Sequence, residues 1–239
     1  MLKAMFKRKN PFVRVVALLA LSLPGALALP GCEADQDRIL ADAQACLDQA
    51  TPTQAPRCTA MVAGLTSTQS YAIRCSVHFV VEGVTGLRFA NAFQQIKSST
   101  GTSDPLTLVL GDLVFATTAG TDGSVATLAD CKASGDPGLL QVALLTSIGT
   151  YVAVNSTPAP TPAADGSLTA AQIKSAAQTF TGSTAVLGDF TVQANASFCA
   201  VGSSLTANKV CLDLASAISA GSSGGNPAIG TALLALLAQ

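Results

Sequence analysis

The residues of this chain that could do acid–base chemistry gather around its one histidine, His78. Arg74 precedes it by four residues and Glu82 follows it by four, so a helix would place the three side chains on one face, with Tyr71 nearby. In a functional interpretation, Glu82 orients His78 as a general base. We favour a structural one, a polar stripe on an otherwise apolar helix, because no G-x-S-x-G motif or other nucleophile accompanies the histidine.

Other reactive groups are equally isolated. Cys75 lies three residues before His78, but in an oxidising compartment a disulfide is favoured over a catalytic thiol. Asp112 and Asp189 each end a copy of the string VLGD and could act as a pair of acids, but we favour surface or turn positions for both. No phosphate loop, dinucleotide fingerprint or zinc-ligand spacing occurs. We therefore expect no catalytic site, no metal and no cofactor.

The elements that would hold these side chains are short helices, because apolar residues recur at helical spacing. Predicted helix starts are the capping boxes at 66–69 and 169–172 and the pairs Asp104-Pro105, Asp136-Pro137 and Asn226-Pro227. The sequence thus predicts an all-α fold of roughly ten short helices packed as antiparallel hairpins, with a helical-repeat-like array as one arrangement. The stripes are Ile73, Val77, Val80, Val81 and Val84; Leu106, Val109, Leu110, Leu113 and Val114; and Leu140, Leu144, Ile148, Tyr151 and Val152.

The two VLGD strings leave an alternative open. Each Gly-Asp pair is flanked by apolar residues, which is also the pattern of a β-hairpin with a two-residue turn. We favour helices because Asp104-Pro105 caps the first copy, and Leu187, Phe190 and Phe198 recur at helical spacing around the second. Glycine within these helices would let neighbouring helices approach closely.

The first 31 residues have the features of an export signal. Residues 3–14 carry five Lys and Arg residues, and the apolar run that follows over 15–29 is shorter than the ~20 residues of a transmembrane helix. The run ends in Leu29-Pro30-Gly31-Cys32, which resembles the lipobox of bacterial lipoprotein precursors. The resemblance implies that Cys32 receives a diacylglyceryl group, that residues 1–31 are removed and that the new amino terminus is acylated. The alternative is an ordinary secretory signal with Cys32 in a disulfide.

The residue after Cys32 indicates which membrane would retain the protein. In the sorting known for this family, Asp at that position favours retention in the inner membrane, whereas this chain has Glu33. We therefore expect the protein in the cell envelope, held by a lipid anchor such as palmitate. The outer membrane, on its periplasmic or surface face, is favoured over the inner membrane.

The other six cysteines form an even set, which favours three disulfides in an oxidising compartment. Two pairs, 46/58 and 199/211, have the same spacing, and each brackets a polar turn of an expected helix hairpin. Fifteen pairings are possible for six cysteines, and the matched spacing favours one of them. That pairing is Cys46–Cys58, Cys199–Cys211 and, by elimination, Cys75–Cys131.

Charge and composition set the remaining expectations. Without residues 1–31 the chain has eight basic and 14 acidic residues, a net charge near −6, which argues against nucleic-acid binding. Residues 32–37 form an acidic lipidated tether, followed by helical halves over 38–154 and 168–239. The Pro-rich segment 155–167 is either a linker between the halves or a long surface loop.

The sequence therefore predicts a membrane-tethered envelope protein that acts as a non-enzymatic interaction or structural module. Its partners would be the membrane, through the lipid anchor, and an envelope protein. The alternative function is a periplasmic carrier that binds a lipid or another apolar ligand between its helices. A hydrophobic cavity of several hundred Å³ would favour the carrier, and a shallow groove with an exposed apolar patch would favour the interaction module.

Overall fold

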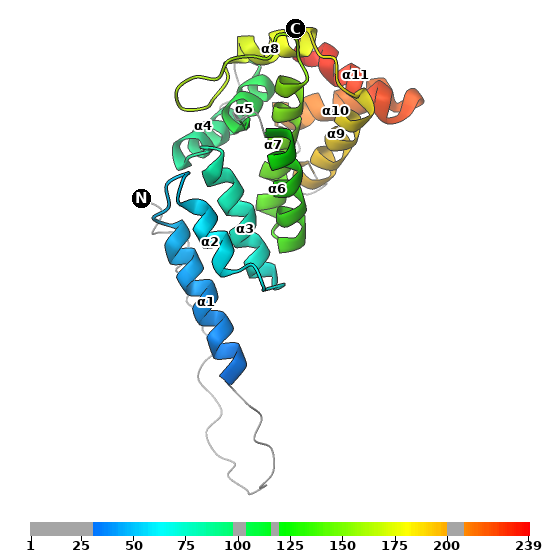
Figure 1. The fold of residues 1–239 in the computed structure, drawn as a ribbon. Helices are drawn as coiled ribbons and strands as arrows, with labels where there is room; N and C mark the ends of the chain where they lie inside the picture. The colour runs from blue at the N-terminus through cyan, green and yellow to red at the C-terminus, as the bar shows by residue number, and fades with distance from the viewer. Residues whose placement is uncertain (1–30, 98–103, 116–119, 200–207) are drawn as a thin grey trace, which may run out of the picture.

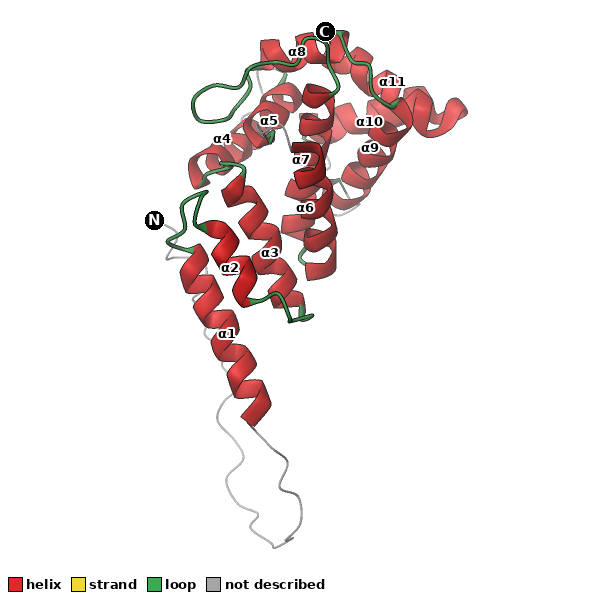
Figure 2. Cartoon of the chain, viewed as in Figure 1, coloured by secondary structure: helices red, strands yellow, loops and turns green. Residues whose placement is uncertain are grey.

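The computed structural model describes residues 31–97, 104–115, 120–199 and 208–239, and this part of the chain is all-α, as predicted (Figures 1 and 2). It contains eleven α-helices and one 3₁₀ helix, joined mostly by short turns, and an isolated antiparallel bridge between Ser156 and Phe180. The helices are α1 Gly31–Leu47, α2 Ala55–Met61, α3 Thr68–Val81, α4 Gly86–Lys97, α5 Pro105–Leu113, α6 Gly120–Ser134, α7 Pro137–Val154, α8 Ala170–Gln178, α9 Thr184–Phe198, α10 Lys209–Gly221, the 3₁₀ turn Ser222–Gly224, and α11 Gly225–Leu237.

Three of the predicted helix starts are confirmed by their capping hydrogen bonds. The Asp136 side chain accepts from the backbone N–H groups of Gly138 and Leu139, at 2.8 and 3.0 Å, so it satisfies two donors that the first turn of α7 leaves free. Asp104 caps α5 in the same way. Thr169 and Gln172 form the predicted capping box at the start of α8.

Two predicted starts are wrong in position. The cap of α3 is Ser67, one residue after the predicted Thr66, because the Ser67 hydroxyl accepts from the N–H of Ser70. Asn226-Pro227 does not start α11, which begins at Gly225 without a side-chain cap. Gly225 has a φ of +65°, a left-handed conformation that suits glycine, and it is this turn that redirects the chain into α11.

Residues of both predicted halves build one main hydrophobic core around α7. Helix α7 is apolar and long enough to cross a membrane, but more than half of it is buried inside the protein, where it packs against α5, α6, α8 and α9. Leu144, Ile148 and Val152 of its predicted stripe are fully buried. The C-terminal helix α11 packs on α9 and α10 through Leu233 and Leu237, as its apolar sequence suggests.

Both VLGD strings are helical, as favoured, and their glycines bring backbones together. A Cβ at Gly188 in α9 would lie 1.9 Å from the carbonyl oxygen of Asn226 in α11, and one at Gly111 in α5 would lie 2.1 Å from the carbonyl oxygen of Leu168. Any side chain at these positions would force the neighbouring backbone away. Glycine therefore sets the distance between α9 and α11.

The Pro-rich segment 155–167 is a surface loop and does not separate two independent halves. Its ends are fixed by backbone hydrogen bonds from Thr181 to the Asn155 oxygen, at 2.7 Å, and from Leu168 to the Gly111 oxygen, at 3.0 Å. Gln172 holds its middle by donating to the carbonyl oxygen of Thr161. Figure 2 shows the loop running between α7 and α8 along one end of the molecule.

Helices α1 and α2 form a hairpin that packs on the outer side of α3, and α1 projects beyond the rest of the molecule (Figure 1). A satellite cluster of seven buried residues holds this hairpin: Leu40, Ala43, Ala55, Cys58, Val62, Ile73 and Val77. Residues 32–37, predicted as a separate tether, belong to α1.

Candidate functional site

The histidine is paired with an aspartate from another helix. His78 Nε2 in α3 lies 3.0 Å from Asp130 Oδ2 in α6, and both side chains are half-buried. Because α3 and α6 pack along each other, this pair joins two neighbouring helices. Glu82, which would orient His78 in the disfavoured functional interpretation, lies beside Gly123 of α6.

Arg74 also has a structural role. Its guanidinium donates to the carbonyl oxygens of Val62, at 2.7 Å, and of Leu65, and so satisfies carbonyls at the end of α2 and in the turn before α3. It stacks over the Tyr71 ring, 4.8 Å from the ring centre. Arg74 and His78 of the polar stripe thus connect α3 to neighbouring segments.

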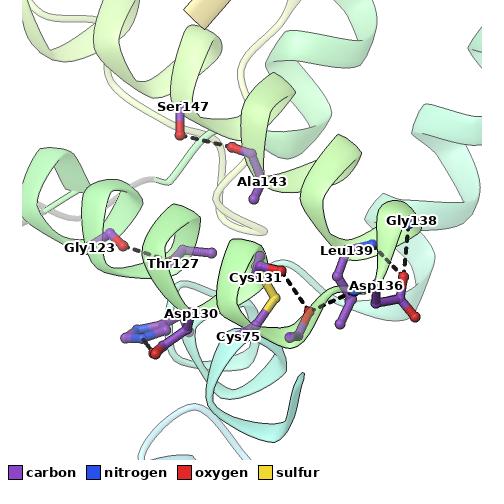
Figure 3. Close-up of a disulfide and its surroundings, with 12 residues drawn as sticks. Cys75, Gly123, Thr127, Asp130, Cys131, Asp136, Gly138, Leu139, Ala143 and Ser147 are labelled. Atoms are coloured by element: carbon purple, nitrogen blue, oxygen red, sulfur yellow. Dashed lines mark hydrogen bonds and ion pairs between the residues drawn. A yellow bond between two sulfur atoms is a disulfide. The ribbon is translucent and has the colours of Figure 1, made fainter. Parts of the chain in front are cut away.

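Asp130 of this pair lies beside a disulfide (Figure 3). Cys75, one turn before His78, is bonded to Cys131, the residue after Asp130, and both cysteines are fully buried. Cys75 is therefore unavailable as the thiol nucleophile that its position three residues from His78 could suggest. Ser134 donates to the Cys131 carbonyl oxygen and accepts from the Asp136 N–H, which connects the bridge to the cap of α7.

We expect His78→Gln to change the free energy of unfolding by well under about 1 kcal/mol, because the side chain is partly exposed and glutamine can still donate to Asp130. The variant should also keep the biological function of the protein. Urea unfolding measures the first effect, and complementation of a deletion strain measures the second. A variant that folds normally but fails to complement would indicate chemistry at His78.

The two aspartates of the VLGD strings do not form a pair. Asp189 is exposed on α9 and accepts from Gln193 one turn later. Asp112 lies on α5, where burial raises the pKa of its carboxyl group and the nearby Arg88 opposes that shift. Each aspartate therefore has its own local environment. Their placement does not support the hypothesis that they act together as a pair of acids.

The most buried charge of the described residues, Arg88 in α4, was not singled out from the sequence. It is 1% exposed, and its guanidinium donates to backbone carbonyl oxygens: Nε to Asp112 at 2.7 Å and Nη2 to Val114 at 2.7 Å. Nη1 reaches the oxygens of Gly83 and Asp165 at 3.3 and 3.4 Å. Arg88 thus caps the C-terminal end of α5 and ties it to the turn after α3 and to the long loop.

A sequence signal for Arg88 did exist. Ala92 lies four residues after Arg88 in α4, and Val84 lies four residues before it in the turn that precedes the helix; both are buried, so the arginine stands on the apolar face of α4. Burial lowers the pKa of Arg88, and the carboxylates of Asp165 and Asp112 oppose that shift. A charge in the middle of an apolar stripe indicates a buried polar network.

A second buried charge is Asp213 of α10, 5% exposed and paired with Lys209 one turn earlier. Burial raises the pKa of Asp213, and the hydrogen bond from Lys209 opposes the shift. Its other carboxylate oxygen has no hydrogen-bond partner among the residues that the structure describes. Within the part of the chain that the structure describes, no group of three His, Cys, Asp or Glu side chains is arranged to hold a metal ion.

All three disulfides form with the predicted pairing. Cys46–Cys58 joins α1 to α2, Cys199–Cys211 joins the end of α9 to α10, and Cys75–Cys131 joins α3 to α6. The two bridges with equal spacing close helix hairpins, as expected. The third crosses the interior, between helices that are far apart in the sequence.

An apolar hollow opens where α4, α5, α7 and α9 meet. Phe89 and Phe93 of α4, Val142 of α7 and Phe198 of α9 form most of its wall. Its free volume is about 10 Å³, the order of a single water molecule. Phe93 is 47% exposed at this site, so the hollow and its rim form a small apolar patch at the surface.

A larger and more open hollow of about 510 Å³ lies on the outer face of the α1–α2 hairpin. Its lining is mixed: Asp42, Cys46 and Gln49 come from α1 or the turn after it, and Gln54 and Arg57 come from the start of α2. Polar and apolar groups share its wall, in contrast to the hollow at Phe93.

Comparison with protein-family models, with characterised proteins and with solved structures finds no match to this chain. The fold and the contacts of its own residues are therefore the basis for assigning a function.

Proposed function

We propose that this protein is a lipid-tethered component of the bacterial cell envelope, in the outer membrane, and that it acts as a non-enzymatic interaction module. The lipobox-like segment ending in Cys32 supports the tether. Two or three acyl chains on one residue would anchor the protein stably, whereas a single chain binds reversibly. Three disulfides are in keeping with an oxidising compartment.

The size of the apolar hollow at Phe93 is the observation that favours an interaction module over a carrier. Ligand pockets typically have volumes of ~300–1,000 Å³, and this hollow has about 10 Å³. The exposed Phe93 at its rim offers an apolar surface for contact with a protein partner rather than a cavity for a ligand. An acyl chain would need the helices around it to separate.

A photo-crosslinking amino acid in place of Phe93, in the native envelope, tests this function. We expect a discrete crosslinked protein from this position. Leu87 is the matched control, because it is an apolar residue of the same helix, is 70% exposed and does not line the hollow. Crosslinking to lipid instead of protein at Phe93 would support the carrier, and equal crosslinking at both positions would contradict a specific surface.

We expect Cys32→Ala to abolish acylation, because the thiol that carries the diacylglyceryl group is lost, and the protein should no longer be retained by membranes. Metabolic labelling with a fatty-acid analogue, followed by membrane fractionation, measures both effects. Cys46→Ala is the control, since it removes a cysteine of the same helix without removing the anchor site. Equal labelling of Cys32→Ala and the parent protein would contradict the tether.

A further inference from the structure

The Cys46–Cys58 bridge is placed differently from the other two disulfides. Cys58 is fully buried, but Cys46 is only half-buried and lines the open hollow on the α1–α2 hairpin. Cys75 and Cys131 are both fully buried in the main core. A thiol can therefore approach Cys46 from solvent, whereas the central bridge is reached only after the core opens.

The Cys46–Cys58 bridge also differs from Cys199–Cys211 in how it is packed. Cys199 is half-buried like Cys46, but it and Cys211 pack in the main cluster of 26 buried residues. Cys58 belongs to the satellite cluster of seven buried residues, against which Cys46 packs. Because local opening costs less free energy where fewer apolar contacts are lost, the α1–α2 hairpin should open before α9 and α10 separate.

The hollow also has the size and charge to receive a reacting partner. Its volume of about 510 Å³ accommodates several side chains. Arg57, which precedes Cys58 in the sequence, lines it and favours the approach of a thiolate, while Asp42 across the hollow opposes it. Gln49 and Gln54 also line the hollow, and their amide side chains can hydrogen-bond to an extended polypeptide.

We propose that Cys46–Cys58 is a thiol–disulfide exchange site for a dithiol protein that docks in this hollow. A thiolate of the partner attacks Cys46 Sγ, a mixed disulfide forms, and Cys58 leaves as a thiolate that takes up a proton from water. The second partner thiolate then attacks the mixed disulfide and releases Cys46, which is protonated in turn. The partner dithiol is oxidised to a disulfide, and the Cys46–Cys58 bridge is reduced to two thiols.

Reduction of the Cys46–Cys58 bridge would change how α1 is held. This consequence does not depend on the proposed interaction function. The bridge joins α1 to α2, so its loss leaves α1 held mainly by Leu40, Ala43 and their apolar neighbours. The projecting helix α1 can then separate from the body, while the other two disulfides keep the main core intact.

The order of reduction in the native, full-length exported protein tests the proposal. Dithiothreitol serves as the dithiol, free thiols are alkylated at intervals, and peptide mapping identifies them. We expect Cys46 and Cys58 to be alkylated at least ~tenfold faster than the other four cysteines, with helix content largely retained. Faster reduction of Cys199–Cys211, or simultaneous reduction of all three bridges, would overturn the proposal.

A second measurement identifies the sulfur that is attacked. Glutathione has one thiol, so mixed disulfides with it accumulate and can be mapped by mass spectrometry. We expect glutathione on Cys46, with Cys58 free. Glutathione on Cys58 would contradict attack from the hollow, even if this bridge were the first to be reduced.

Discussion

Replacing Cys75 and Cys131 together by alanine is expected to lower the free energy of unfolding by about 4 kcal/mol. This bridge closes the longest of the three loops, with a sequence separation of 56 residues. A crosslink stabilises chiefly by restricting the unfolded chain, and the restriction grows with the logarithm of the loop length. The two cysteines also join α3 to α6 in the main core, so their removal loses buried contacts as well.

The double variant Cys199→Ala/Cys211→Ala is the matched control. It removes a bridge from the same main cluster, but with a separation of only 12 residues. The expected loss is about 3 kcal/mol. Urea unfolding followed by circular dichroism measures both variants. A central bridge whose removal costs less than that of the short one would show that its loop length does not determine its contribution.

The disulfide pairing and the helical fold could be predicted from the sequence because both depend on local patterns. Equal spacing around two polar turns indicated two hairpin bridges, and with six cysteines the third pair followed by elimination. The helices at Asp104 and Asp136 start at Asp-Pro pairs, whose side-chain caps need only nearby backbone groups. Local hydrogen bonds of this kind are encoded within four residues.

The side-chain partners were predicted less well, because they depend on how the helices pack. The one-face arrangement of Arg74, His78 and Glu82 suggested contacts along α3, yet His78 is hydrogen-bonded to Asp130, 52 residues away. The start of α11 was misplaced for a similar reason. Packing of its backbone against Gly188 of α9 and the left-handed turn at Gly225 fix where that helix begins.

The buried arginine is the clearest case of a role that only tertiary structure reveals. The carbonyl oxygens it binds come from the turn after α3, from the end of α5 and from the long loop. These segments are distant in the sequence, and none carries a motif that indicates a cation. The only local sign was a charge on the apolar face of α4.

We expect Arg88→Ala to lower the free energy of unfolding by ~3–5 kcal/mol, because it leaves buried carbonyl oxygens without donors and opens a cavity. The oxygens of Asp112 and Val114 lose the shortest hydrogen bonds, at 2.7 Å each, and the end of α5 loses its cap. Urea unfolding provides the measurement. Arg57→Ala is the control, because Arg57 is exposed, and such surface substitutions usually stay within ~0.5 kcal/mol.

Arg88→Met separates hydrogen bonding from packing. Methionine fills much of the space of the arginine side chain but cannot donate to the carbonyl oxygens. If hydrogen bonding dominates, Arg88→Met will be nearly as unstable as Arg88→Ala, and Arg88→Lys will recover only part of the loss, because one ammonium group cannot reproduce the planar fork that reaches four carbonyls. Parent-like stability of Arg88→Met would show instead that Arg88 acts mainly by filling the space between α4, α5 and the loop.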